Sequence, residues 1–201
     1  MDRKTLLVGL TVFLLVGVVA ASVFFFSKPA SFRGTAYGEP YPVAPEIELT
    51  RANGKDFRLS EARGEVVALF FGYTSCPDIC PTTMAELNQA LEKLGNRSEQ
   101  VQVLFVTVDP ERDTPQRVQE YVNHFNTDFI GLSGSESELA GVWNEYGVFR
   151  EVVDGTSAAG YLVNHTARVT LIDQQGNLRV SFGFDTPVED VVHDLDLLLK
   201  E

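Results

Sequence analysis

The sequence predicts an α/β fold, a mixed β-sheet with helices on both faces, preceded by an N-terminal transmembrane helix. Val66–Phe71 is an unbroken apolar run of strand length, and Val101–Val108 is a second, mostly apolar run, which is typical of central strands covered on both sides. The segments after these runs carry apolar residues at steps of three and four, which predicts amphipathic helices. Ala167–Ile172 and Leu178–Phe184 flank a cluster of turn residues and predict an antiparallel hairpin.

The start of the chain predicts a membrane anchor. Leu6–Phe26 contains 21 residues without a charge, enough for a helix to span the roughly 30 Å hydrocarbon core. A cleaved signal peptide is the alternative, because residues 19–22 are small enough for a cleavage site. The apolar run continues for several residues beyond that site, which favours an uncleaved anchor.

Charges and composition around the anchor predict its orientation and the nature of the segment after it. Arg3 and Lys4 place residues 1–5 in the cytoplasm, so the remainder is expected on the extracytoplasmic, periplasmic side of a bacterial plasma membrane. Residues 27–45 are rich in proline and glycine and predict a tether. The globular domain is therefore expected to span residues 46–201.

Turn and capping signals predict the other elements of the domain. Asn53-Gly54 lies between two short alternating runs and predicts a hairpin before the first core strand. Helix starts are predicted at Thr114-Pro115, at the capping box of Ser135 and Glu138, and at Thr186-Pro187. The resulting order, β-α-β-α-α-β-β-α, fits a mixed sheet with helices on both faces.

The charge of the chain argues against one class of partner. The net charge is -12 and the isoelectric point about 4.7. Nucleic-acid-binding proteins need basic surfaces to neutralise phosphates, so we expect no nucleic acid to bind.

The only two cysteines lie between the first core strand and its helix. Cys76 and Cys80 occur in the sequence FFGYTSCPDICPTTMAE. Proline suits the first position of a helix, so Pro81 is expected to begin the helix, with residues 76–79 in a loop and Cys80 near the N-cap. A helix N-terminus favours negative charge, which predicts that both thiols ionise more easily than a free cysteine.

The CxxxC spacing is one residue longer than the redox CxxC spacing, and it leaves room for both sulfurs to bind one metal ion. Two thiolates are too few for most metals, so a third ligand is sought among the histidines. His193 and His124 are expected on helix surfaces. His165 precedes a strand that can lie beside the cysteine turn, and from this pattern it is either a ligand or a structural histidine.

Three segments resemble signature motifs of the Sco/SenC family: FFGYTSCPDICPTTMAEL, TVDPERDTP and YLVNHTARVTLIDQQGNL. The resemblance runs from about Pro45 to Glu201. It implies a thioredoxin-like fold, a membrane anchor, a bound copper ion and a role in assembling the dinuclear copper centre of cytochrome c oxidase. The implied copper ligands are Cys76, Cys80 and His165. The family commonly has Asp where this chain has Asn164, so the resemblance implies the histidine ligand here but not a charge beside it.

The resemblance also implies partners. One is the copper-binding subunit of cytochrome c oxidase, to which another copper donor is added. On the oxidising side of the membrane we also expect a thiol reductant that keeps the cysteines open. Soft thiolates with an imidazole suit copper, and a closed disulfide cannot bind it. We therefore expect a metallochaperone rather than an enzyme.

Two alternatives use the same cysteines. In a thiol–disulfide oxidoreductase, Cys76 and Cys80 would cycle between dithiol and disulfide, with the more exposed Cys76 attacking first. The CxxxC spacing and the absence of proline from residues 116–186 count against this, because such enzymes normally oppose the dithiol with a proline. A purely structural disulfide would close only a small loop and stabilise little.

Four other residues near these motifs could contribute chemistry. Asp109 and Asp113 could act as an acid–base or metal-binding pair, but turn formation after a strand is the simpler interpretation. Asp78 can tune the local charge. Met84 follows Cys80 by four residues and could be a soft ligand, although a methionine at apolar helix spacing is usually a core residue.

Overall fold

The computed structural model describes residues 2, 12–18, 31–157 and 160–201. The chain forms two compact units, Met1–Ser31 and Phe32–Glu201. In the first unit residues 12–18 are helical, and the rest of the predicted 6–26 anchor lies outside the described residues. Among the helices that are described, none has both the length and the apolar character needed to cross a membrane.

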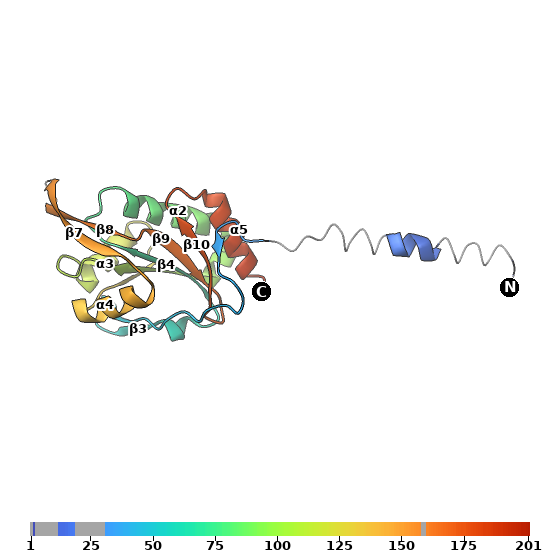
Figure 1. Cartoon of the computed structure of the whole chain (residues 1–201), viewed down its shortest axis with the longest axis horizontal. Coiled ribbons are helices and arrows are strands. Elements are labelled where there is room, and N and C mark those ends of the chain that lie inside the picture. Colours follow the sequence, from blue (N-terminus) through green and yellow to red (C-terminus); the bar gives the residue numbers. More distant parts are fainter. Residues whose placement is uncertain (1, 3–11, 19–30, 158–159) are drawn as a thin grey trace. The chain divides into compact units, whose positions relative to one another are not determined.

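A six-stranded mixed sheet forms the centre of the second unit, with strand order β1-β10-β9-β4-β5-β6 (Figure 1). Strands β4, β5 and β6 are parallel, whereas β9 is antiparallel to β4, and β10 pairs antiparallel with both β9 and β1. The mixed α/β sheet predicted from the sequence is therefore confirmed. The bounds are β1 Thr35–Ala36, β4 Val66–Gly72, β5 Val101–Thr107, β6 Ile130–Leu132, β9 Arg168–Ile172 and β10 Leu178–Gly183.

Helices cover both faces of this sheet. Phe70 and Phe71 are neighbours in β4 and point to opposite faces. On the Phe70 side, Phe105 of β5 packs 5.9 Å from Phe70 and 5.4 Å from Tyr121, measured between ring centroids. On the other side, Phe71 packs 5.5 Å from Tyr146. Helices α2 (Ile79–Leu94), α3 (Pro115–Asn123) and α5 (Val188–Leu198) thus share one face, and α4 (Glu136–Glu145) covers the other.

Short elements complete the edges of the domain. The predicted hairpin around Asn53-Gly54 is present as β2 (Glu48–Thr50) and β3 (Asp56–Arg58), and β2 contacts α4. Two 3-10 helices, Leu59–Ala62 and Gly95–Gln100, precede β4 and β5.

Two of the three predicted helix caps are present. The Thr114 hydroxyl accepts a hydrogen bond from the backbone N–H of Arg117, and Ser135 forms a reciprocal capping box with Glu138. The prediction that Thr186 caps the last helix is wrong. Its hydroxyl donates to the Gly183 carbonyl instead, and α5 begins after Pro187 without a side-chain cap.

The domain begins earlier than residue 46. Arg33 and Gly34 donate backbone N–H groups to the buried carboxylate of Asp194 in α5, each at 2.9 Å. Strand β1 then pairs with β10, and the Leu178 N–H donates to the Pro42 carbonyl at 2.8 Å. The latter part of the predicted tether is therefore built into the domain, because its backbone groups find partners there.

A second hairpin was not predicted from the sequence. Strands β7 (Arg150–Ser157) and β8 (Gly160–His165) pair antiparallel and project from the body of the domain at the upper left of Figure 1. The turn-forming residues Asp154-Gly155 lie within β7, whose pairing with β8 shifts register between Val153 and Ser157. Strand β6 was also not predicted, because it is only three residues long and shows no pattern of its own.

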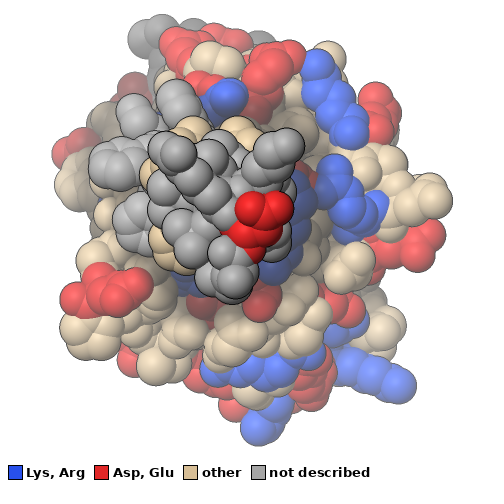
Figure 2. Space-filling view, turned by 90° about the vertical axis from the view of Figure 1, so that its right-hand side faces the viewer, with Lys and Arg blue, Asp and Glu red and all other residues tan. Residues whose placement is uncertain are grey.

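Acidic and basic side chains are mixed on the side of the domain that carries α5. Figure 2 looks at this side, and blue and red residues are interspersed on the part that can be seen. Several of the cations are paired with acids of α5: Arg33 with Asp190, Lys93 with Glu189, and both Arg97 and Lys200 with Asp196. This visible surface offers mixed charge rather than a basic patch.

Candidate metal centre

The CxxxC segment joins β4 to α2 at the carboxyl ends of the parallel strands. Helix α2 begins at Ile79, with Asp78 as its N-cap, so Cys80 is the second helical residue and Pro81 the third. The prediction that Pro81 begins the helix is therefore wrong by two residues. Proline is tolerated at this position because its missing N–H is among the four that have no partner at a helix start.

The two cysteines have different surroundings. Both are free thiols; Cys80 is fully buried, whereas Cys76 is half-buried in the loop. The Cys80 backbone N–H donates to the Cys76 sulfur at 3.4 Å. The helix start thus contacts the loop cysteine directly, as expected for a thiol near a helix N-terminus.

His165 reaches the cysteines from β8, of which it is the last residue. Its Nε2 lies 3.7 Å from the Cys80 sulfur, and its Nδ1 lies 3.1 Å from the Thr166 carbonyl oxygen. A carbonyl oxygen only accepts, so Nδ1 carries a proton, and Nε2 is the ring nitrogen that faces the two sulfurs. The rings of Tyr73 and Phe70 pack edge-on against the imidazole at centroid distances of 5.8 and 6.4 Å. The structure therefore brings the three predicted residues together.

The contacts move the pKa values of the two thiols in opposite directions. A hydrogen bond from the Cys80 thiol, with a smaller contribution from His165 and from backbone N–H groups, lowers the pKa of Cys76 to about 4 despite partial burial. The pKa of Cys80 is raised, first because its thiol donates to Cys76 and then because it is buried. The prediction that both thiols ionise easily thus holds for Cys76 alone. The pair exists as one thiolate and one thiol near neutral pH.

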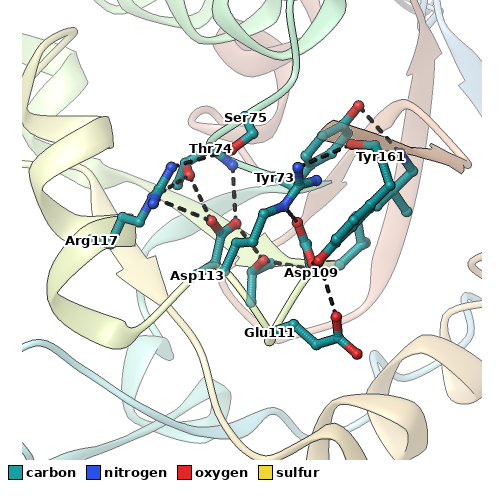
Figure 3. Close-up of polar contacts among 12 residues, drawn as sticks. Tyr73, Thr74, Ser75, Asp109, Glu111, Asp113, Arg117 and Tyr161 are labelled. Atoms are coloured by element: carbon teal, nitrogen blue, oxygen red, sulfur yellow. Dashed lines mark hydrogen bonds and ion pairs between the residues drawn. The ribbon is translucent and has the colours of Figure 1, made fainter. Parts of the chain in front are cut away.

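Asp113 joins the cysteine loop to the end of β5 (Figure 3). Its fully buried carboxylate accepts hydrogen bonds from the Thr74 N–H (3.0 Å), the Thr74 hydroxyl (2.6 Å) and the Thr107 hydroxyl (2.7 Å). Burial raises the pKa of Asp113, while these hydrogen bonds act to lower it. On the outer side, Arg117 donates to the hydroxyls of Thr74 and Ser75 at 2.9 and 3.2 Å.

Asp109 lies in an adjacent group of polar contacts. Its buried carboxylate accepts a hydrogen bond from the Tyr161 hydroxyl at 2.7 Å and pairs with Arg112. The Arg112 guanidinium stacks on the Tyr161 ring, 3.7 Å from its centroid, and donates to the Tyr161 carbonyl at 3.0 Å. Asp109 and Asp113 therefore face separate partners, which argues against a carboxylate pair for acid–base chemistry.

The residues that hold the centre together were not predicted from the sequence. Thr74 and Thr166 contact Asp113 and His165, and Arg112 and Tyr161 support the hairpin that carries His165. Thr74 lies only two residues from Cys76, but no spacing rule connects it to an aspartate 39 residues later in the chain.

The other candidates do not contribute to the cluster. His124 is exposed beside the Tyr121 carbonyl, and His193 pairs with its neighbour Asp194 in α5. Met84 is fully buried in the core, and Asn164 points to Glu151 at 3.4 Å rather than to His165. Within the described part of the chain, no three His, Cys, Asp or Glu side chains are already spaced to hold a metal ion.

Comparison with known proteins gives consistent matches over the whole second unit. The family model described as SCO1/SenC matches residues 35–200. The SCO2-like protein of Rickettsia felis is 31% identical over 200 residues, covering 97% of this chain and 98% of that protein.

Two solved structures have the same fold. Apo Sco1 of Thermus thermophilus superposes with a TM-score of 0.75 at 39% identity, covering 86% of this chain and 99% of that one. ScoI of Bradyrhizobium japonicum, solved with copper bound, gives a TM-score of 0.70 at 34% identity, with 78% and 99% covered. With a family match across most of its length, the chain belongs to the SCO1/SenC family.

Proposed function

We propose that this protein is a membrane-anchored copper chaperone that binds copper through Cys76, Cys80 and His165. It assists assembly of the dinuclear copper centre of cytochrome c oxidase, as the family resemblance implies. The observation that carries the proposal is the meeting of two free thiols with an imidazole whose Nε2 lies 3.7 Å from the Cys80 sulfur.

The donor set fits copper. Two thiolates and an imidazole form a soft, mixed site that accommodates Cu(I) and, with rearrangement, Cu(II). Cys76 is already a thiolate near neutral pH, so copper binding displaces one proton, that of Cys80. The Thr166 carbonyl accepts from Nδ1, which orients the imidazole with Nε2 toward the sulfurs as the nitrogen that can bind copper.

The location of the site suits transfer to a partner. Cys76 is half-buried at the edge of the domain, so ligands from another protein can reach a metal ion there. Copper would move to the copper-binding subunit of the oxidase by exchange of ligands. A separate donor supplies the ion, and a thiol reductant keeps Cys76 and Cys80 open. The 21-residue uncharged segment is proposed to hold the domain at the periplasmic face of a bacterial plasma membrane.

The test is a titration of the reduced, anaerobic protein with Cu(I) in competition with a chelator. We expect one ion per chain, loss of tight binding in Cys76→Ser and Cys80→Ser, and weaker binding in His165→Ala. His124→Ala, which changes an exposed histidine outside the cluster, serves as the matched control. Unchanged stoichiometric binding in all three site variants would contradict the proposal.

A thiol–disulfide oxidoreductase is the second candidate, favoured by the unequal thiols. The Cys76 thiolate would attack a partner disulfide, forming a mixed disulfide and releasing one partner sulfur as a thiolate. Cys80 would then lose its proton and attack the Cys76 sulfur, which releases the other partner sulfur as a thiolate and leaves a Cys76–Cys80 disulfide. His165→Ala separates the two functions. It should weaken copper binding under the first, whereas reduction of a model disulfide should persist under the second.

A further inference from the structure

We infer that Asp113 is a positioning residue, which acts through Thr74 to hold the Cys76 loop at a fixed separation from Cys80. The change in copper binding that we expect from this inference rests on the proposed function. The change that we expect in how the two cysteines are held together does not.

The two cysteines are held by different parts of the fold. Cys80 is fully buried in the first turn of α2, and its position is fixed by the packing of that helix. Cys76 lies outside the helix, in a loop whose neighbouring residues Pro77 and Asp78 are exposed. The distance between the sulfurs therefore depends on what holds the loop.

Asp113 provides a fixed point for that loop. Its own backbone is secured at both ends, because its N–H donates to the Asp109 carbonyl at 2.9 Å and its carbonyl accepts from the Ser133 hydroxyl at 2.6 Å. Its carboxylate is also bonded to Thr107, the last residue of β5. The aspartate is thus part of the rigid sheet edge rather than of the loop.

Asp113 holds the loop through two hydrogen bonds from one residue, Thr74. Thr74 presents both its backbone N–H and its hydroxyl to the two carboxylate oxygens, two residues before Cys76. Hydrogen bonds to a carboxylate are shorter and stronger than those between neutral groups. The Cys76 N–H in turn donates to the Tyr73 carbonyl at 3.2 Å, so fixing Thr74 restrains the whole turn.

Burying a carboxylate costs free energy unless its oxygens accept hydrogen bonds, so the donors around Asp113 must offset this cost. The Asp113 carboxylate accepts its hydrogen bonds from Thr74 and Thr107, which belong to the two segments that meet at the centre. Arg117 contacts the same group from the outer side: it lies 3.8 Å from the carboxylate, donates to the Thr74 and Ser75 hydroxyls, and is half-exposed. Exposed ion pairs contribute little, so we assign the restraint to Asp113.

The experiment measures how strongly the loop holds the two thiols together. The reduced protein is equilibrated with oxidised glutathione, so that two protein thiols become one disulfide while one glutathione disulfide becomes two glutathione thiols. The equilibrium constant gives the effective concentration of Cys76 relative to Cys80. It requires no copper.

Thr74→Val removes the hydroxyl that donates to Asp113 and accepts from Arg117, and it nearly preserves the shape of the side chain. We expect the effective concentration to fall about tenfold, which corresponds to about 30 mV for a two-electron couple. Thr74→Ser keeps the hydroxyl and should stay within twofold of the unaltered protein. Thr83→Val is the matched control, because Thr83 donates its hydroxyl to the Ile79 carbonyl within α2 at 2.9 Å and lies outside the loop.

The same variants are then titrated with Cu(I). Weaker binding in Thr74→Val alone supports the inference, whereas an effective concentration within twofold of the unaltered protein, or an equal fall in Thr83→Val, overturns it. If the unaltered protein binds no copper, the proposed function fails, while the glutathione result still decides the role of Asp113. Asp113→Asn is measured beside Thr74→Val with the same expected outcomes, because it keeps the shape, removes one acceptor oxygen and leaves the Thr74 hydroxyl to Arg117. It also replaces Thr74→Val should that variant not fold.

Discussion

At the scale of single residues, the two thiols should differ sharply in reactivity. The pKa of Cys76 is about 4, so its thiolate population is complete well below neutral pH, whereas Cys80 is buried and its pKa is raised. We expect iodoacetamide to modify Cys76 alone, at a rate that stays nearly constant from about pH 6 to 8. Mass spectrometry of the reduced protein checks this. A rate that rises about tenfold per pH unit across that range would show an ordinary thiol.

The cause of the low pKa can be tested separately. Since the Cys80 thiol is the largest influence that lowers the pKa of Cys76, Cys80→Ala should raise that pKa. The pKa of Cys76 should rise because a hydrogen bond to a thiolate stabilises the charged form, and the variant removes the Cys80 thiol that donates this bond. The alkylation rate of Cys76 should then increase with pH over the range in which it was constant. His165→Ala should also raise the pKa of Cys76, but by less. Equal shifts in the two variants would contradict the assignment of the Cys80 thiol as the stronger of the two influences.

The residues of the centre were predictable to different degrees. Cys76 and Cys80 could be found from their count and their place between a strand and a helix, and the family motifs added His165. The contacts that orient them could not be found this way. Thr74 and Asp113, or His165 and Cys80, are brought together only when β4, β5 and β8 are in place, and pairing across that distance leaves no local pattern.

At the scale of elements, the capping box of α4 should contribute measurably to stability. The Ser135 hydroxyl accepts the Glu138 N–H, and the Glu138 carboxylate accepts the Ser135 N–H at 2.8 Å. Ser135→Ala leaves the helix start without its side-chain acceptor and should lower the free energy of unfolding by about 1 kcal/mol. Urea unfolding followed by circular dichroism measures this. Because α4 lies on the face away from α2, the alkylation of Cys76 should not change.

Elements with strong local signals were predicted well, and those defined by tertiary pairing were not. The strands β4 and β5, and the starts of α3 and α4, follow from apolar runs and capping residues. The start of α2 was misplaced because proline was read as the first helical residue, although the third position also has no N–H partner to lose. Strands β1 and β6 are too short for a pattern and exist because a neighbouring strand offers hydrogen-bond partners.

At the scale of the whole molecule, the boundary of the domain is set by contacts made by a segment that looks like a linker. Proline and glycine between residues 27 and 45 suggested a tether, yet residues from Phe32 onward are bonded to β10 and α5. Gly34 fits there because a Cβ atom would lie 2.5 Å from the Phe182 ring and 2.6 Å from Val180. Composition predicts how a segment behaves alone, and it carries no information on a docking surface formed by distant strands.

These contacts limit how far the chain can be shortened. A fragment of residues 46–201 lacks the backbone donors of Arg33 and Gly34, so the fully buried Asp194 carboxylate loses both. It also lacks β1 and the bond from Leu178 to Pro42. Since a typical hydrogen bond contributes about 1 kcal/mol net and an unsatisfied buried group costs about 1–3 kcal/mol, we expect the fragment to be less stable than residues 32–201 by at least about 2 kcal/mol.

Urea unfolding of the two fragments measures the difference, and Asp194→Ala in the longer one provides an independent comparison. That variant removes the acceptor while keeping β1, so it should lose part of the stability that the truncation loses. Both changes lie at α5 and β10, away from the loop of Cys76, so the copper-binding stoichiometry of the folded protein should stay the same. Equal stability of the two fragments would mean that residues 32–45 act as the tether that their composition suggests, and that the domain begins at Glu46.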